Sequence, residues 1–500
     1  MARLDEAFLA LPLDALCEAA LGRAAALGCS HAQVRVERIH TQALSLRDAQ
    51  LEGAVDDVAL GIGLRIVREG TTGFAATVEL TVDAAARLAD LAVALARASA
   101  AGTRRWVELA DEPRHGSLRW VAPHRVDPTA VPLAEKVARF EEWSGRLLAA
   151  PGVAHVTASL LSVVEDKRYA DLSGTVATQR RVRVAPELEA LALGENGFET
   201  MRTCAPPAGR GLEYLDGEGW DFERELAALP ELLAEKLAAP SVEPGRYDLV
   251  IDPTNLWLTI HESVGHATEL DRALGYEAGY AGTSFATPDR LGSLVYGSPL
   301  MQVTGDRTTP HGLATVALDD EGVSAQVFEI VRDGVLVGYQ LDRQIAAEAG
   351  IERSNGCAFA ASPLLVPLQR MANVSLQPAP GDGPTTEELI AGVDRGIYVV
   401  GDKSWSIDMQ RENFQFTGQR FFRIENGRLA GQLRDVAYQA RTTEFWGALN
   451  GLGGAATYLL GGAFNCGKGQ PGQAAPVSHG CPSARFAGIS VLNARAEAGW

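Results

Sequence analysis

The chain has 500 residues, 46% of them apolar and 22% charged, a balance that is typical of folded globular proteins and excludes wholesale disorder. Its length exceeds the usual span of one hydrophobic core, so we expect two or three domains. The formal net charge of −18 repels phosphate backbones and argues against nucleic acid as a direct partner.

The N-terminal stretch predicts an amphipathic helix instead of an export signal. Asp5, Glu6 and Asp14 interrupt its apolar residues, which an apolar signal core would not tolerate. The sequence contains no run of about 18 uninterrupted apolar residues, so we expect no membrane span. Six cysteines are too few for a disulfide framework in a chain of this length. We therefore expect a cytoplasmic protein with reduced thiols.

The first half of the sequence alternates between strand and helix patterns. Apolar and polar residues alternate at 33–39, as in a half-buried strand, and Leu88, Leu91, Leu95 and Ala98 line one face of a helix at 84–98. The expected strands cover 33–39, 43–49, 59–68, 74–76, 153–168 and 174–195, and the expected helices cover 84–98, 132–149 and 221–238. Residues 101–131 are rich in Pro, Arg and His and predict a loop. Pro230 should kink the last helix or split it in two.

A domain boundary follows this helix. Pro240, Pro244 and Gly245 cannot continue a helix and indicate a linker. We therefore divide the chain into an N-terminal domain, residues 1–239, and a C-terminal domain, residues 240–500.

The second half predicts a mostly β domain with one marked helix at 253–269. Asp-Gly at 333–334 and Asn-Gly at 426–427 are turn sequences between apolar runs, and each predicts a β-hairpin. Two shorter helices are expected near 341–349 and 385–393.

The sharpest chemical feature lies in the marked helix, where His261, Glu262 and His266 fall within six residues. Asp252 is a good helix N-cap, and Pro253 suits the first helical position because its missing N–H is not needed there. The two histidines therefore lie on, or at the end of, a helix that follows a strand, 247–251.

The spacing of the two histidines requires an irregular helix. Residues four apart share a face of an α-helix, but these are five apart, and their side chains would diverge by roughly 140°. A π-helical turn, with i→i+5 hydrogen bonds, would realign them, and Gly265 can permit it. We therefore expect non-α backbone between His261 and His266.

These residue types suit a catalytic zinc ion. Neutral imidazoles are good ligands, and catalytic zinc takes three protein ligands and leaves one position for a water whose pKa falls to about 7. Glu262 would be the general base, accepting the proton of that water and passing it to the leaving amine. The structural alternative is a pair of core or surface histidines with a solvated glutamate.

The spacing of the histidines does not identify the third protein ligand. The candidates are Glu269, Cys466, His479 and Cys481. Cys466 is followed by Gly in a predicted loop, so its thiolate could approach an ion, and Lys468 would favour the thiolate form.

Several stretches make the sequence similar to the TldD/PmbA family, on the TldD side. They are Gly-Ile-Gly-Leu-Arg-Ile-Val at 61–67, Thr-Gly-Phe-Ala at 72–75, His-Glu-Ser-Val-Gly-His at 261–266, Gln-Arg-Met-Ala-Asn at 369–373 and Cys-Gly-Lys-Gly-Gln-Pro at 466–471. The likeness spans nearly the whole chain, and the His-Glu and Cys-Gly-Lys pieces together are quite specific.

The resemblance implies a zinc metallopeptidase that acts on peptides or unfolded protein segments. It carries the zinc ligands onto His261, His266 and Cys466, and the catalytic glutamate onto Glu262. It implies an α+β fold, with an N-terminal α/β domain and a β-rich, barrel-like C-terminal domain that carries the metal helix. It also implies a dimer, formed with a second copy or with a metal-free relative.

Two segments depart from the family pattern. Asn-Gly-Cys-Ala at 355–358 replaces an expected Gly-Asn-Gly-Arg-Arg type of stretch, and the region after Cys466 carries His479 and Cys481, which could compete for the metal. An extended peptide could bind by adding a strand to the β domain. Thr283, Ser284 and Asn373 are candidates for nearby polar contacts, or else turn residues.

Two other functions compete with the peptidase. One is a non-hydrolytic metal-binding subunit with a regulatory or assembly role. The other is a metal-dependent hydrolase that acts on a non-peptide amide.

Overall fold

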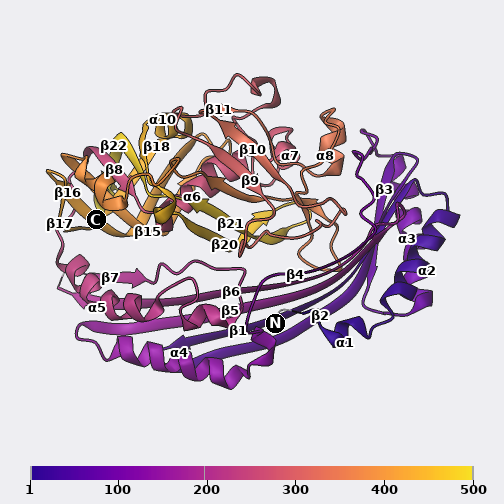
Figure 1. Cartoon of the computed structure of the whole chain (residues 1–500), viewed down its shortest axis with the longest axis horizontal. Helices are drawn as coiled ribbons and strands as arrows, with labels where there is room; N and C mark the ends of the chain where they lie inside the picture. Colours follow the sequence, from indigo (N-terminus) through magenta and orange to yellow (C-terminus); the bar gives the residue numbers. More distant parts are fainter. Residues whose placement is uncertain (1–2, 196, 498–500) are drawn as a thin grey trace.

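The computed structural model describes residues 3–195 and 197–497, and it has two facing halves (Figure 1). The N-terminal half is a long sheet with helices on its outer side, and the C-terminal half is rich in strands. Figure 1 shows β20 (Leu459–Lys468) and β21 (Gln473–Cys481) facing the N-terminal sheet. The predicted α+β fold class is confirmed.

The N-terminal sheet has the strand order β3-β2-β1-β5-β6-β4, with β7 paired to β6. Its strands are β1 (His31–Arg47), β2 (Gln50–Arg68), β3 (Thr71–Thr77), β4 (Ser117–Val121), β5 (Val153–Asp171), β6 (Val176–Gly194) and β7 (Gly197–Arg202). The two strands expected at 33–39 and 43–49 are one strand, because β5 pairs with β1 without a break across 40–42. The loop expected at 101–131 contains β4, which lies parallel to β6.

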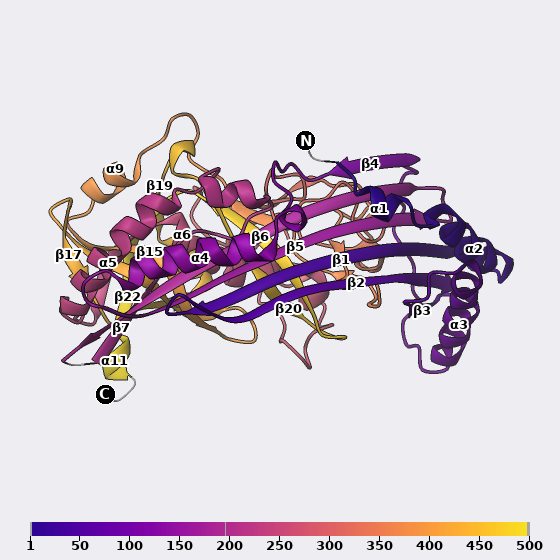
Figure 2. The ribbon, with the colours of Figure 1, turned by 90° about the horizontal axis from the view of Figure 1, so that it is seen from below.

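Helices cover the outer face of this sheet in two groups (Figure 2). They are α1 (Glu6–Leu9), α2 (Leu13–Ala26), α3 (Val82–Ala100), α4 (Leu133–Leu148) and α5 (Phe222–Ala238). The first two share a core with α3 at one end, and the last two share a core at the other. Pro230 lies inside α5 without splitting it, because burial of Leu226, Leu229 and Leu233 outweighs one missing hydrogen bond.

The C-terminal half contains a closed five-stranded barrel. Its order is β15-β8-β22-β18-β16, and the ring closes because β15 pairs in parallel with β8 and antiparallel with β16. The barrel strands and the two attached strands are β8 (Gly245–Ile251), β15 (Arg395–Ile407), β16 (Asn413–Glu425), β17 (Arg428–Leu433), β18 (Val436–Arg441), β19 (Leu449–Leu452) and β22 (Ala484–Asn493). The barrel-like domain predicted from the resemblance is therefore confirmed.

Smaller sheets and short helices surround the barrel. The remaining strands are β9 (Val303–Asp306), β10 (Val327–Arg332), β11 (Val335–Leu336), β12 (Ala358–Phe359), β13 (Leu368–Gln369) and β14 (Asn373–Leu376), and the remaining helices are α6 (Pro253–Ile260), α7 (Leu270–Ala273), α8 (Arg343–Glu348), α9 (Thr386–Ala391), α10 (Thr442–Gly447) and α11 (Ala494–Glu497). Both predicted hairpins form, β10–β11 and β16–β17. Their turns need positive φ, which Asp333, Gly334, Asn426 and Gly427 supply.

The chain passes from one half to the other between α5, which ends at Ala238, and β8, which begins at Gly245. The division into domains 1–239 and 240–500 stays a prediction. Within the described ranges, none of the helices combines the length and apolar character that a membrane crossing requires.

Gly73 provides a test of how α3 packs on the sheet. A Cβ at this position would lie 1.9 Å from the backbone oxygen of Ala92 in α3. We expect Gly73→Ala to lower the free energy of unfolding by about 1–3 kcal/mol, because the helix must move away from β3. Urea denaturation followed by circular dichroism measures the change.

Gly22→Ala is the matched control. Gly22 lies inside α2, and a Cβ there has open space around it. This substitution should raise stability by about 0.5–1 kcal/mol, since Ala is the better helix former. Equal effects of the two substitutions would contradict the close approach of α3 to β3.

Candidate metal centre

The metal helix begins as predicted and then changes its hydrogen-bonding pattern. The Asp252 side chain accepts from the backbone N–H of Thr254 (3.0 Å), and α6 starts at Pro253. A π-helical turn covers His261–Gly265, and a 3₁₀ turn covers His266–Thr268. The predicted non-α backbone between the two histidines is confirmed.

The π-helical turn brings the two imidazoles onto one side of the helix. Their ring centroids lie 4.7 Å apart, whereas a regular helix would point them in divergent directions. Gly265 closes the turn in a tight space, because a Cβ there would lie 2.9 Å from Sδ of Met371 and 3.4 Å from Cε1 of His479. The glycine therefore makes room for neighbouring side chains as well as allowing the irregular backbone.

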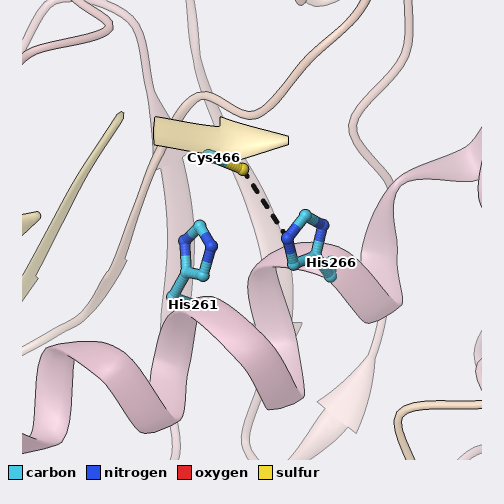
Figure 3. Close-up of side chains that lie close together, drawn as sticks. All are labelled: His261, His266 and Cys466. Carbon is cyan, nitrogen blue, oxygen red and sulfur yellow. Dashed lines mark hydrogen bonds between the residues drawn. The ribbon is translucent and has the colours of Figure 1, made fainter. Parts of the chain in front are cut away.

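Cys466 reaches the histidines from the β20–β21 hairpin. The pairing of the two strands shifts register between Ala463 and Cys466, which forms a bulge. Sγ of Cys466 lies 3.6 Å from Nε2 of His266, and Figure 3 shows the thiol above the two rings. The three potential ligand atoms of His261, His266 and Cys466 all lie within 4.8 Å of one another.

The other three candidate ligands lie outside this cluster. Glu269 and His479 contact the far sides of the histidines: Nδ1 of His266 is 2.8 Å from Glu269, and Nδ1 of His261 is 2.7 Å from Nε2 of His479. Sγ of Cys481 faces the backbone oxygen of Pro253 at 3.7 Å. Of the candidate third ligands, the structure therefore gathers Cys466 alone with the two histidines.

The protonation states suit a zinc ion. Burial lowers the pKa of both His261 and His266, so both imidazoles are neutral at pH 7. Burial raises the pKa of the Cys466 thiol to about 11, so metal binding must displace its proton. Two neutral imidazoles and one thiolate leave a fourth tetrahedral position open, which is the ligand set of a catalytic zinc site. These residues fit zinc.

A buried charge cluster lies behind His266. Nζ of Lys468 lies 3.0 Å from Glu269, 2.8 Å from Asp271 and 3.2 Å from Glu277. Burial dominates the pKa of Cys466, and the charge of Lys468 lowers it, in the direction that the sequence predicts. The direct contacts of Lys468 are with these carboxylates. The cluster stabilises the glutamate that hydrogen-bonds to His266.

Glu262 lies in the π-helical turn, with 5% of its surface exposed. Nη1 of Arg411 donates to Oε2 of Glu262 (2.6 Å). Arg411 comes from the turn between β15 and β16, where it has a φ of 63°, and its backbone oxygen accepts from the Thr442 hydroxyl (2.7 Å). The sequence analysis missed Arg411, because it lies 149 positions after Glu262 and no motif links the two residues.

The site opens into a cavity of about 450 Å³ between the two halves of the molecule. His261, Glu262, His266 and Cys466 line it from the C-terminal half, and residues 202–207 line it from the N-terminal half. A ligand in this cavity would therefore touch both halves.

Thr283, Ser284 and Asn373, the predicted candidates for polar contacts, are not among the residues that line this cavity. Ser284 donates to the backbone oxygen of Ala267 (2.6 Å), and the side chain of Asn373 bonds to the backbone of Ala314 and Asp306. The backbone N–H of Thr283 donates to Met409 (2.9 Å). The hydrogen bonds of Ser284 and Asn373 are made within the protein, and Asn373 lies in β14 and not in a turn.

Two family models match the sequence. The model described as PmbA/TldA metallopeptidase C-terminal domain covers residues 244–493, and the model described as PmbA/TldA metallopeptidase domain 1 covers residues 32–96. The chain belongs to the PmbA/TldD family. This membership confirms the resemblance that the sequence motifs indicated.

Individual proteins match between about half and nearly all of the chain. A protein named metalloprotease from Methanothermobacter thermautotrophicus is 28% identical over 461 residues, which are 92% of this chain and 95% of the relative. A zinc metalloprotease TldD homolog from Saccharolobus solfataricus is 26% identical over 54% of this chain and 57% of its own. The crystal structure of TldE from Thermococcus kodakarensis is 15% identical, covers 95% of this chain and 100% of its own, and has a TM-score of 0.72. That last likeness shows the fold alone.

Proposed function

We propose that the chain is a zinc-dependent peptidase that hydrolyses peptides or unfolded protein segments. Relatives named metalloproteases support a metallopeptidase in general. The observation that carries the finer proposal is the buried cluster of His261, His266 and Cys466 beside Glu262, at one wall of the cavity.

The chemistry follows from the residues around the cluster. When bound, zinc supplies a Lewis acid that lowers the pKa of water. Glu262 takes a proton from the attacking water and gives it to the leaving amine. Arg411 holds one oxygen of Glu262 in place through the 2.6 Å hydrogen bond, so the second oxygen is free for this exchange.

The hairpin β20–β21 supports a peptide as substrate. In the described part of the chain β20 pairs with β21 alone, and residues 461–467 of β20 line the cavity. An extended peptide can add to such a free edge through main-chain hydrogen bonds, with little dependence on its sequence. This edge favours a peptide over a small non-peptide amide.

The proposal also covers assembly and location. We propose a dimer, with a second copy or a metal-free relative, on the resemblance of the motifs alone. We propose a cytoplasmic location because all six cysteines, which lie within the described ranges, are unpaired. The alternative function is a non-hydrolytic metal-binding subunit of a larger complex.

Cys466→Ser tests the metal site on which the proposal rests. The wild-type chain should carry about one zinc ion, and the variant should lose it together with peptide hydrolysis, because a serine hydroxyl is a poor zinc ligand. Zinc content of the purified proteins, measured by atomic emission, checks this.

Cys481→Ser is the matched control, since Cys481 is an equally buried thiol outside the cluster. It should keep its zinc. Equal zinc content in wild type and Cys466→Ser would remove Cys466 from the ligand set and with it the proposed function.

A further inference from the structure

We propose that His479 is a positioning residue that holds His261 in the tautomer required for metal binding, with its proton on Nδ1 and the lone pair of Nε2 free. The proposal rests on the proposed metal site and adds a residue to it. His479 is the side chain that contacts the second nitrogen of His261.

The hydrogen bonds of His479 determine its own tautomer. Its ring is fully buried, and Nδ1 lies 2.9 Å from the backbone oxygen of Val374. A carbonyl oxygen can only accept, so Nδ1 of His479 carries a proton. A neutral imidazole has a single N–H, so Nε2 of His479 must be an acceptor.

The tautomer of His261 then follows. Nδ1 of His261 lies 2.7 Å from that acceptor nitrogen, so it must donate. Its proton is therefore on Nδ1, and Nε2 keeps the lone pair that a metal needs. Both rings are buried, which favours their neutral forms.

His479 is held rigidly for this task. Its strand, β21, lies against β14, where the backbone N–H of Gly480 donates to the hydroxyl of Ser375 (2.9 Å). The indole of Trp257 stacks on its ring with an interplanar angle of 10°. Gly265 leaves space for the same ring, because a Cβ there would lie 3.4 Å from Cε1 of His479.

The two histidine ligands are thus oriented by unlike partners. His266 donates to the carboxylate of Glu269, which carries a charge that Lys468 balances. His261 donates to the neutral imidazole of His479, which in turn donates to the backbone oxygen of Val374. These hydrogen bonds add no charge to the site. Partners of this kind commonly change metal affinity by about 10–100-fold when they are removed.

The glutamine and asparagine variants separate this role from simple packing. In His479→Gln the side-chain oxygen can still accept from His261, whereas in His479→Asn the shorter amide can reach Val374 but not His261. We expect His479→Asn to weaken zinc binding by about 10–100-fold, with His479→Gln close to wild type. The zinc dissociation constant, measured by competition with a chromophoric chelator, gives this result whether or not the protein hydrolyses peptides.

The tautomer can also be read without any variant. In the zinc-free wild-type chain labelled with ¹⁵N-histidine, two-bond ¹H–¹⁵N spectra should show His261 and His479 both protonated on Nδ1. An Nε2–H tautomer of either ring, or equal zinc affinities of the two variants, would overturn the proposal. Failure of peptide hydrolysis with these results intact would overturn only the proposed function.

Discussion

Glu262→Gln should lower peptide hydrolysis by about 10²–10⁴-fold and leave the zinc content unchanged. An amide oxygen can still accept from Arg411, so the local structure should persist, but the amide cannot take a proton from water. The ligand atoms of His261, His266 and Cys466 are not altered by the change. Initial rates on an unstructured peptide, measured beside the zinc content of each preparation, test both parts.

Glu412→Gln is the control for this substitution. Glu412 follows Arg411 in the same turn, but its carboxylate pairs with Arg441 at the surface, where such a pair contributes little. The peptidase activity of Glu412→Gln should stay near that of wild type. Zinc-dependent hydrolysis that survives in Glu262→Gln would show that another group is the base. Absence of hydrolysis in zinc-loaded wild type would favour the non-hydrolytic subunit.

The metal helix was predictable because its irregularity follows from residue spacing. Two histidines five positions apart cannot share a face of an α-helix, so a π-helical turn is required if they bind one ion. The hairpins were predictable for the same local reason, since Asp-Gly and Asn-Gly favour their turns. The third ligand was not local: it came from the resemblance, and a bulge in β20 positions it.

Long-range pairing set the limit of sequence reasoning. The barrel closes through the parallel pairing of β8 with β15, which are joined by more than a hundred residues of other structure. Arg411 and His479 reach the site from the turn after β15 and from β21, respectively. Their roles depend on which strands become neighbours, and no residue spacing along the chain encodes that.

Lys468→Met should destabilise the fold by about 3–5 kcal/mol at pH 7. The ammonium group is the shared partner of Glu269, Asp271 and Glu277, and all four side chains are buried. Without it, Arg272 remains to pair with Glu269 and Glu277, and Asp271 loses its ion pair. Urea denaturation of the zinc-free proteins measures the loss, and Lys403→Met, which changes an exposed lysine, should have little effect.

The pH dependence of this loss has a definite sign. Burial already raises the pKa of Asp271 to about 6 in the wild-type chain, and removing the cation raises it further. A carboxyl group whose pKa is higher in the folded state than in the unfolded state stabilises the fold at low pH, and this stability is lost as pH rises. The difference in the free energy of unfolding between wild type and Lys468→Met should therefore become smaller from pH 7 to pH 5.5. A difference that becomes larger would exclude an uncompensated carboxylate as the cause.

A second substitution separates lost charge from lost packing. Asp271→Asn keeps a side-chain oxygen that can accept from the backbone N–H of Arg272 (2.8 Å) but removes the negative charge. If uncompensated charge causes the instability, the double variant Lys468→Met/Asp271→Asn should be more stable than Lys468→Met alone. If the cause is the altered shape of the lysine side chain, the two losses should add. The first result would show that Lys468 balances the buried charge of Asp271, next to Glu269, the carboxylate that orients His266.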